Sequence, residues 1–327
     1  MSSESNDKMH PNDFDPDRFA RGGKYAFELQ FACEGIDVNI PVLLVRGRKG
    51  GNTLSVTAGI HGDEHEGTQT IFDVYSSLNP NDMSGDLLAV PVANPLAFWN
   101  GTRTSGADGA DLARCFPGDL ESGPTRTIAY HLARSIIGRG DFFLDFHSAG
   151  IKLLMPTLVG YNAQDSRSRD AAFVFGARVV WAHPDIPAGR TISFASSQGI
   201  PWLYTEARGA GRIDPGDLEL FTLGLENLMR HLSILPGGVK PVRVDSHLYG
   251  DGNTDSSIMA SGRGFFIPKV KLLQAVRRGE ELGRIVNLRG EAMQIYCAPN
   301  DGVVAVIRQA PMVESGAPLF LLTGTLA

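Results

Sequence analysis

Apolar and polar positions follow two different rhythms along the first two thirds of the chain. Short, mostly apolar runs predict strands over residues 37–45, 54–60, 87–93, 142–147, 154–159, 179–182 and 201–206. Longer stretches with apolar residues three or four positions apart predict helices over residues 64–78, 124–137, 169–176 and 218–235. Several strand runs are almost entirely apolar, as expected for strands covered on both faces. Strands alternating with helices predict an α/β fold in which helices pack on both faces of a sheet.

The pattern changes after residue 237. The segment from Leu235 to Gly238 ends the last helical stretch, because proline and glycine both interrupt a helix. Beyond it, short β segments separated by Gly and Pro predict a small all-β domain. We therefore expect a catalytic domain over residues 24–237 and a β domain over residues 238–327. The polar and acidic residues 1–23 are expected to form a mobile N-terminal arm.

Composition and charge exclude several classes of protein. The 327 residues carry 30 Lys or Arg against 36 Asp or Glu, a net charge of −6 without any basic block, so no nucleic-acid partner is expected. The sequence contains no long uncharged apolar run, so neither a membrane span nor a secretory signal is expected. The three cysteines, Cys33, Cys115 and Cys297, are too few and too scattered for a disulfide framework or a cysteine-built zinc site. These features predict a cytoplasmic protein with a small-molecule substrate.

Two metal-binding side chains follow a predicted strand in the segment from Val56 to Gly67. His61 and Glu64 lie three positions apart, and imidazole and carboxylate are both ligands that suit Zn²⁺. Gly59 and Gly62 flank His61, so the chain can turn sharply at the strand end and direct the imidazole away from the sheet. The carboxyl ends of strands are where open α/β sheets place their active sites. A charged, solvated loop is the alternative interpretation.

His65 allows a second interpretation of the same segment. His61, Glu64 and His65 match the inverted zinc-protease pattern, in which both histidines bind the metal and the glutamate is the base. That pattern needs a continuous helix, whereas Gly62 and the preceding β run place His61 before the helix. We therefore expect His65 on the helix surface.

A third ligand is expected from the end of another buried strand. The run that begins at Phe142 ends in His147, followed by the small residues of an open turn. With His61 and Glu64 it would form a triad with a free fourth position, the arrangement of catalytic zinc. Asp145, two residues earlier, could orient the His147 ring. For this strand alone, a core histidine bonded to the backbone remains the alternative.

Further candidates for the chemistry lie at a third strand end and in a long loop. Glu206 ends an apolar strand and could act as the base toward water, although it could equally pair with Arg208. The Gly/Asp/Arg-rich loop over residues 94–118 contains Arg103, which could stabilise an oxyanion, and Arg114, which could bind a substrate carboxylate. Asp111 of the same loop is another candidate for substrate binding. Solvated surface side chains are the alternative for this loop.

These motifs, in this order, resemble those of the succinylglutamate desuccinylase and aspartoacylase family of the zinc carboxypeptidase superfamily. The resemblance spans about residues 40–325 and rests on Gly-Ile-His-Gly-Asp-Glu-His-Glu-Gly, Asn-Pro-Leu-Ala, Asp-Leu-Ala-Arg-Cys-Phe-Pro-Gly, Asp-Phe-His-Ser and Thr-Glu-Ala-Arg-Gly. It implies a three-layer α/β/α domain with a mixed, mostly parallel eight-stranded sheet.

The resemblance also implies roles for individual residues. One zinc ion would be held by His61, Glu64 and His147. Glu206 would be general base and acid, and Arg103 would polarise the carbonyl. Arg114 would bind a carboxylate of the substrate.

Two parts of the chain qualify the resemblance. Ala113 stands where the family usually has Asn, which removes an amide donor that relatives use on the substrate carboxylate. The tail resembles the barrel-like β domain of biotinyl and lipoyl carriers, but Gln294 occupies the place of the modified lysine. We expect the tail to be a rim or lid over the active site, or a contact in a homo-oligomer, and not a carrier.

Together these observations predict a zinc-dependent amidohydrolase that removes the acyl group from a small N-acylated amino acid or related amine. Glu206 would accept the proton as water attacks and then protonate the departing amine, while the metal and Arg103 stabilise the oxyanion. A zinc carboxypeptidase acting on short peptides is an alternative, which Ala113 disfavours. A metal-free binding module that uses the same cleft is another.

Overall fold

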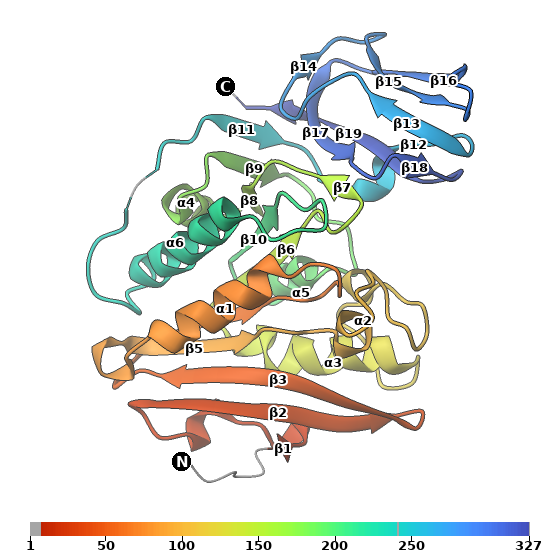
Figure 1. The fold of residues 1–327 in the computed structure, drawn as a ribbon. Coiled ribbons are helices and arrows are strands. Elements are labelled where there is room, and N and C mark those ends of the chain that lie inside the picture. The colour runs from red at the N-terminus through yellow and green to blue at the C-terminus, as the bar shows by residue number, and fades with distance from the viewer. Residues whose placement is uncertain (1–7, 241, 327) are drawn as a thin grey trace.

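A large mixed sheet forms the centre of the molecule in the computed structural model, which describes residues 8–240 and 242–326 (Figure 1). Its eight main strands, in spatial order, are β2 (Gly23–Cys33), β3 (Ile36–Arg46), β5 (Ser84–Val90), β4 (Lys49–Thr57), β6 (Phe142–Ser148), β10 (Trp202–Ala207), β8 (Leu158–Asn162) and β9 (Val179–His183). Two short strands extend the edges, β1 (Lys8–Met9) beside β2 and β11 (Ser246–Tyr249) beside β9.

Strand directions confirm the predicted sheet. The central pairs β5–β4, β4–β6 and β6–β10 are parallel, as is β8–β9. The pairs β2–β3, β3–β5 and β10–β8 are antiparallel. Because β4, β6 and β10 are parallel neighbours, their carboxyl ends meet at one edge of the sheet.

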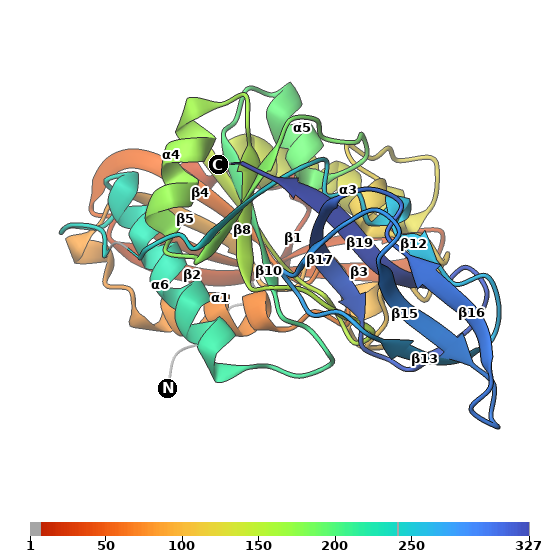
Figure 2. The same cartoon turned by 90° about the horizontal axis from the view of Figure 1, so that it is seen from above.

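Helices cover both faces of this sheet (Figures 1 and 2). One face packs against α1 (Glu66–Ser77), α4 (Ser166–Phe175) and α6 (Pro215–His231), and the other against α2 (Pro95–Phe98), α3 (Pro124–Ser135) and α5 (Thr191–Ser197). Side chains of β5 alternate between the two cores, with Leu87 and Ala89 in one and Leu88 and Val90 in the other. The three-layer arrangement is therefore confirmed.

No helix in the described part of the chain is both long and apolar enough to cross a membrane.

The expected mobile arm is wrong for residues 8–23, which pack against the sheet. β1 pairs with β2, and Phe14 is buried against Phe27 with ring centroids 5.4 Å apart. The apolar residues of this segment are scattered among acidic ones, so the hydrophobic pattern did not predict that the segment packs against the sheet. Residues 1–7 of the arm lie outside the described residues.

The described part of the chain also has short 3₁₀ turns, which are η1 (Pro11–Asp13), η2 (Pro16–Arg18), η3 (Pro80–Asp82), η4 (Leu112–Arg114), η5 (Ile137–Arg139) and η6 (Thr254–Ser256).

Several elements differ from the expected pattern. The strand expected over residues 154–159 divides into β7 (Leu153–Leu154) and β8, because Pro156 has no N–H to continue a ladder. β2 and α5 were not expected at all. β2 nevertheless carries a clear alternation, with the side chains of Phe27, Leu29 and Phe31 buried at every second position.

The C-terminal region is the expected small all-β domain, built from two antiparallel sheets. One sheet has the order β16-β15-β13-β18, and the other, formed by β12, β19, β17 and β14, continues the main sheet through β11. Their bounds are β12 (Ile258–Met259), β13 (Gly264–Pro268), β14 (Ala275–Val276), β15 (Glu281–Val286), β16 (Ala292–Cys297), β17 (Gly302–Arg308), β18 (Met312–Val313) and β19 (Pro318–Thr325). Phe266, Leu282 and Phe320 lie in the shared core between the sheets.

The two regions of the chain share strand pairs at their border. β11 lies beyond residue 237 yet pairs with β9 of the main sheet, and on its other side it pairs with β19. In the opposite direction, β7 of the main region pairs with β17. The chain between β11 and β12 therefore runs along the border of both regions.

Candidate metal centre

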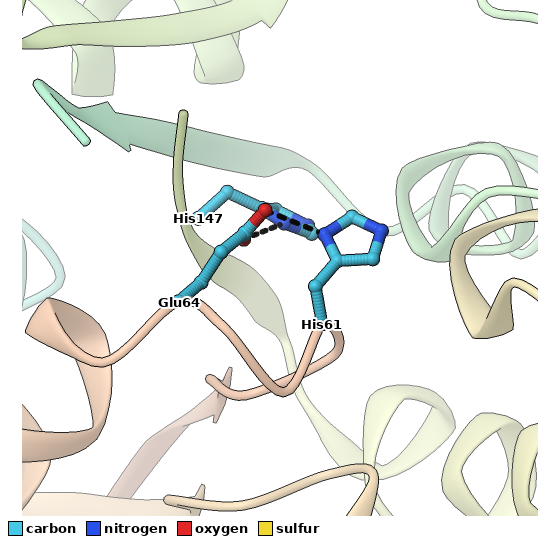
Figure 3. Close-up of side chains that lie close together, drawn as sticks. All are labelled: His61, Glu64 and His147. Atoms are coloured by element: carbon cyan, nitrogen blue, oxygen red, sulfur yellow. Dashed lines mark hydrogen bonds and ion pairs between the residues drawn. The ribbon is translucent and has the colours of Figure 1, made fainter. Parts of the chain in front are cut away.

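Three side chains from two segments meet at the carboxyl edge of the sheet (Figure 3). His61 lies in the loop after β4, Glu64 in the turn before α1, and His147 near the end of β6. Glu64 Oε1 lies 2.7 Å from His61 Nδ1, and Oε2 lies 2.9 Å from His147 Nδ1. One potential ligand atom from each residue lies within 4.8 Å of the others. The triad expected from the sequence is thus brought together.

Two glycines allow this loop to take its path. Gly59 has a φ of +64°, in the left-handed region that favours glycine. A Cβ at Gly62 would lie 2.1 Å from the carbonyl carbon of Ala97, so no larger residue fits there. Gly62 N also donates to the Thr102 carbonyl at 2.9 Å, which ties the triad loop to the segment that carries Arg103.

Carboxylates hold the far nitrogen of each histidine. His147 Nε2 donates to Asp145 Oδ2 at 3.0 Å, and His61 Nε2 lies 3.1 Å from Asp111 Oδ1. Asp145 is fully buried and also accepts from Thr57 and Thr191. Such partners set the tautomer and orientation of a ligating imidazole. The orienting contact expected from Asp145 is present, whereas Asp111, expected to bind substrate, has partners within the chain.

This donor set fits a metal ion. A carboxylate accepts hydrogen bonds, so each Nε2 carries a proton, and each Nδ1 faces Glu64 across a position that a cation can fill. A proton on Nδ1 fills this position when no metal is bound, and a neutral ring offers its lone pair when one is. Although burial opposes it, the Asp145 and Glu64 carboxylates raise the pKa of His147 well above its usual value. Burial acts to raise the pKa of Glu64, but the His61 and His147 imidazoles outweigh burial and lower this pKa.

Glu206 lines the same pocket, one strand from His147. The parallel pairing of β10 and β6 puts the two residues in register. Glu206 Oε2 is buried and has no hydrogen-bond partner among the described residues. Burial and the nearby Glu64 carboxylate raise the pKa of Glu206 to about 8. The expected alternative, an ion pair with Arg208, is not formed in the described part of the chain.

Arg103 reaches the triad from the long loop. Its Nη1 lies 3.7 Å from Glu64 Oε1, and its Nε donates to Asp111 Oδ2 at 3.2 Å. The side chain remains 45% exposed, so one side of the guanidinium is open to the pocket. This position leaves it able to meet an acyl oxygen beside the triad.

His65 takes no part in the triad. It is the N-cap residue of α1, its Nε2 lies 3.0 Å from the Gly62 carbonyl oxygen, and its ring packs edge-on against Phe98. The geometry therefore does not support the inverted zinc-protease pattern, which requires His65 as a ligand.

Two arginines form a second part of the pocket lining, which we call its outer end. The pocket has about 870 Å³ of empty space that is continuous with solvent, and Arg114 and Arg190 both line it. Burial and the neighbouring Arg114 lower the pKa of Arg190. Ala113, the position that departs from the family pattern, also lines the pocket. Two guanidinium groups in one cleft favour an anionic ligand.

Some pocket residues were missed by sequence reasoning. His183 ends β9, Tyr204 precedes Glu206 by two positions in β10, and Arg190 is the N-cap residue of α5. His183 repeats the signal used for His147, a buried strand that ends in histidine. Tyr204 shares the face of β10 that carries Glu206. No comparable signal marked Arg190.

Comparison with known proteins agrees with this geometry. The catalytic-domain model of the succinylglutamate desuccinylase/aspartoacylase family matches residues 50–232. The chain belongs to this family. Membership makes it a metal-dependent deacylase that hydrolyses C–N amide bonds, and the His–Glu–His triad is consistent with a single metal ion.

Individual relatives in the family are similar over most of their length. An N-alpha-acetyl-L-2,4-diaminobutyric acid deacetylase of Halomonas elongata is 31% identical over 288 residues, covering 85% of this chain and 84% of the relative. The succinylglutamate desuccinylase/aspartoacylase from Rhodobacter sphaeroides superposes with a TM-score of 0.85 at 26% identity, covering 96% of this chain and 98% of that one. The product-bound ectoine utilization protein EutE (DoeB) from Ruegeria pomeroyi has a TM-score of 0.84 at 25% identity, covering 94% and 97%.

Proposed function

We propose that this chain is a zinc-dependent deacylase that removes the acyl group from the nitrogen of a small amino acid with a free carboxylate. The observation that carries the proposal is the joint lining of one pocket by the metal triad, by Glu206 and by a pair of arginines. This combination supplies a metal site, a proton acceptor and a carboxylate site within the reach of a single small molecule.

An N-acetylated diamino acid is the first substrate to test. The relative from Halomonas elongata, whose name gives such a substrate, supports this choice. Asp185 and Asp251 also line the pocket, and a second amino group on the substrate would offer them a cation.

The pocket residues take different roles in hydrolysis. His61, Glu64 and His147 would hold zinc, which supplies Lewis acidity toward the carbonyl and toward water when bound. Glu206 accepts the proton of the attacking water on its carboxylate and delivers it to the leaving nitrogen. Its raised pKa suits a group that must both take and return a proton near neutral pH.

Four further residues support this arrangement. Arg103 donates to the acyl oxygen as negative charge develops there. Asp145 keeps the His147 ring in the orientation that presents Nδ1 to the metal. Arg114 and Arg190 bind the carboxylate and place the scissile amide beside Glu206.

Metal analysis combined with a substrate panel tests the proposal. The purified protein should contain about one zinc per chain, and it should release acetate from N-acetyl amino acids faster than it cleaves dipeptides. Faster cleavage of dipeptides would point to a carboxypeptidase. A metal-poor protein that binds ligands without hydrolysing them after zinc addition would point to a binding module.

The location and assembly of the protein remain proposals as well. We propose a cytoplasmic location, which the free thiols of Cys33, Cys115 and Cys297 support. We also propose that the β domain takes part in a homo-oligomer contact, and measurement of the molar mass in solution tests this.

A further inference from the structure

One short segment contacts both arginines at the outer end of the pocket. We call residues 250–256, between β11 and β12, the connecting loop, and Arg114 and Arg190 the guanidinium pair. Arg190 Nη2 donates to Asn253 Oδ1 at 3.0 Å. Arg114 binds Asp255 with two nitrogens, Nε at 3.3 Å and Nη2 at 3.2 Å. Each guanidinium is thus held by a different side chain of the same loop.

The loop is itself internally ordered. Asn253 N donates to Asp251 Oδ1 at 3.0 Å, and Asp255 N donates to Asn253 Oδ1 at 3.1 Å. Asn253 Oδ1 therefore accepts hydrogen bonds from both the Asp255 backbone N–H and the Arg190 guanidinium. A side chain fixed in this way can restrict the rotamers of a long arginine, which loses conformational entropy on ordering.

The same loop also acts on a third pocket residue. His183 Nδ1 donates to the Gly250 carbonyl at 2.7 Å, which leaves Nε2 as an acceptor for the Tyr204 hydroxyl at 2.9 Å. His183 is buried, and burial lowers its pKa to about 4, so the neutral ring persists at neutral pH. The contacts of the connecting loop therefore extend from its first residue to its sixth.

We propose that Asn253 and Asp255 are positioning residues, which hold the guanidinium pair in the orientation that receives the substrate carboxylate. The inference rests on the proposed function, since it assigns a role in binding the carboxylated end of that substrate. Neither residue touches the reacting atoms; both act through arginines, one in η4 and the other at the N-cap of α5. The loop that borders the β domain thereby sets the affinity for carboxylated substrates.

The first test compares two substrates in loop variants of the zinc-loaded, full-length protein. Asn253→Ala and Asp255→Ala should each raise KM for an N-acetyl amino acid about fivefold, while kcat changes by less than about twofold. KM for the matching N-acetyl amine without a carboxylate should not change. Equal changes with both substrates, or a fall in kcat alone, would overturn the proposal.

Conservative variants separate positioning from folding. Asn253→Asp keeps an acceptor oxygen for Arg190, and Asp255→Glu keeps the carboxylate for Arg114, so each should recover part of the lost affinity. Thermal unfolding of every variant is measured alongside. A variant of either residue that folds like the parent protein and binds the carboxylated substrate normally despite losing its contact would refute the role of that residue.

Asp245→Ala is the matched control. Asp245 forms an exposed ion pair with Arg178 at 3.0 Å, close in sequence to the loop but outside the pocket lining. Its removal should leave KM unchanged for both substrates. A rise in KM equal to that of Asp255→Ala would show a general charge effect and contradict the proposal.

A double-variant comparison tests the route through Arg114. If Asp255 acts through Arg114, Asp255→Ala should add no further rise in KM when Arg114 is already replaced by Met. An equal rise in both backgrounds would overturn that route. Failure of the proposed function is distinct, because the parent protein itself would then hydrolyse carboxylated and decarboxylated substrates equally well.

Discussion

The two ends of the pocket are built in different ways. At the inner end, Glu64, His61 and His147 have side chains only 3%, 4% and 13% exposed, and they project from strand ends or adjoining turns of a packed sheet. At the outer end, Arg114 is 28% exposed and its partner Asp255 is 62% exposed. The inner contacts are thus shielded from water, whereas the outer ones are screened by it.

This difference separates chemistry from recognition. The groups proposed to hold a metal and move a proton lie at strand ends or in the turn that follows β4, where close packing resists small displacements. The groups proposed to select the substrate lie in η4 and at the N-cap of α5, and such connecting segments tolerate substitution between relatives. Variants at the inner end should therefore abolish turnover, and variants at the outer end should mainly change binding.

The largest effect is expected from removal of a metal ligand. His61→Ala or His147→Ala should lose both bound zinc and activity, since two protein ligands are too few for a catalytic site. Metal content by mass spectrometry and acetate release measure the two properties. His65→Ala is the control and should keep its zinc. Loss of zinc from the His65 variant with retention in the His147 variant would reverse the ligand assignment.

The next largest effect is expected at Glu206. Glu206→Gln keeps the shape of the side chain but cannot accept a proton, so turnover should fall by about 10²–10⁴-fold while zinc remains bound. Binding of the product amino acid, measured by calorimetry, should stay close to that of the parent protein. Loss of zinc would make Glu206 a ligand, and normal turnover would assign the base to another group.

A smaller effect is expected from the groups that orient the histidines. Asp145→Asn removes the charged acceptor of His147 Nε2, and zinc affinity or activity should fall by about 10- to 100-fold. Competition with a chelator of known affinity measures the change. Asp141→Asn, at an exposed residue just before β6, is the control. Unchanged zinc affinity in the Asp145 variant would show that the Thr57 and Thr191 contacts suffice to hold the site.

The smallest effect is expected at the outer end. Arg114→Lys keeps the charge but loses the planar fork, so KM for an N-acetyl amino acid should rise by about tenfold with kcat little changed. Steady-state kinetics check this prediction. A fall in kcat at constant KM would show that Arg114 acts in the chemical step and not in substrate binding. The two ends of the pocket would then not differ in function.

Much of the inner end was predictable because its signals are local. His61 and Glu64 lie three residues apart beside Gly62, and His147 ends an apolar run. Each strand carries enough apolar residues to be predicted from its own sequence, and parallel strands place their carboxyl ends at one edge of the sheet. The short β11 and the packed residues 8–23 carry weaker signals, since they become ordered only by joining the edges of the sheet.

The sequence by itself determined the alternation of strands and helices, the β character of the tail and the candidate ligands, because periodicity and spacing are properties of neighbouring residues. Only the tertiary structure decided that Asp111 turns to His61 and that Asn253 and Asp255 reach the guanidinium pair. Asp111 lies 50 positions from His61 in the sequence, and Asp255 lies 141 positions from Arg114. The packing of the whole sheet brings such distant residues together, so no pattern among neighbouring residues predicts these contacts.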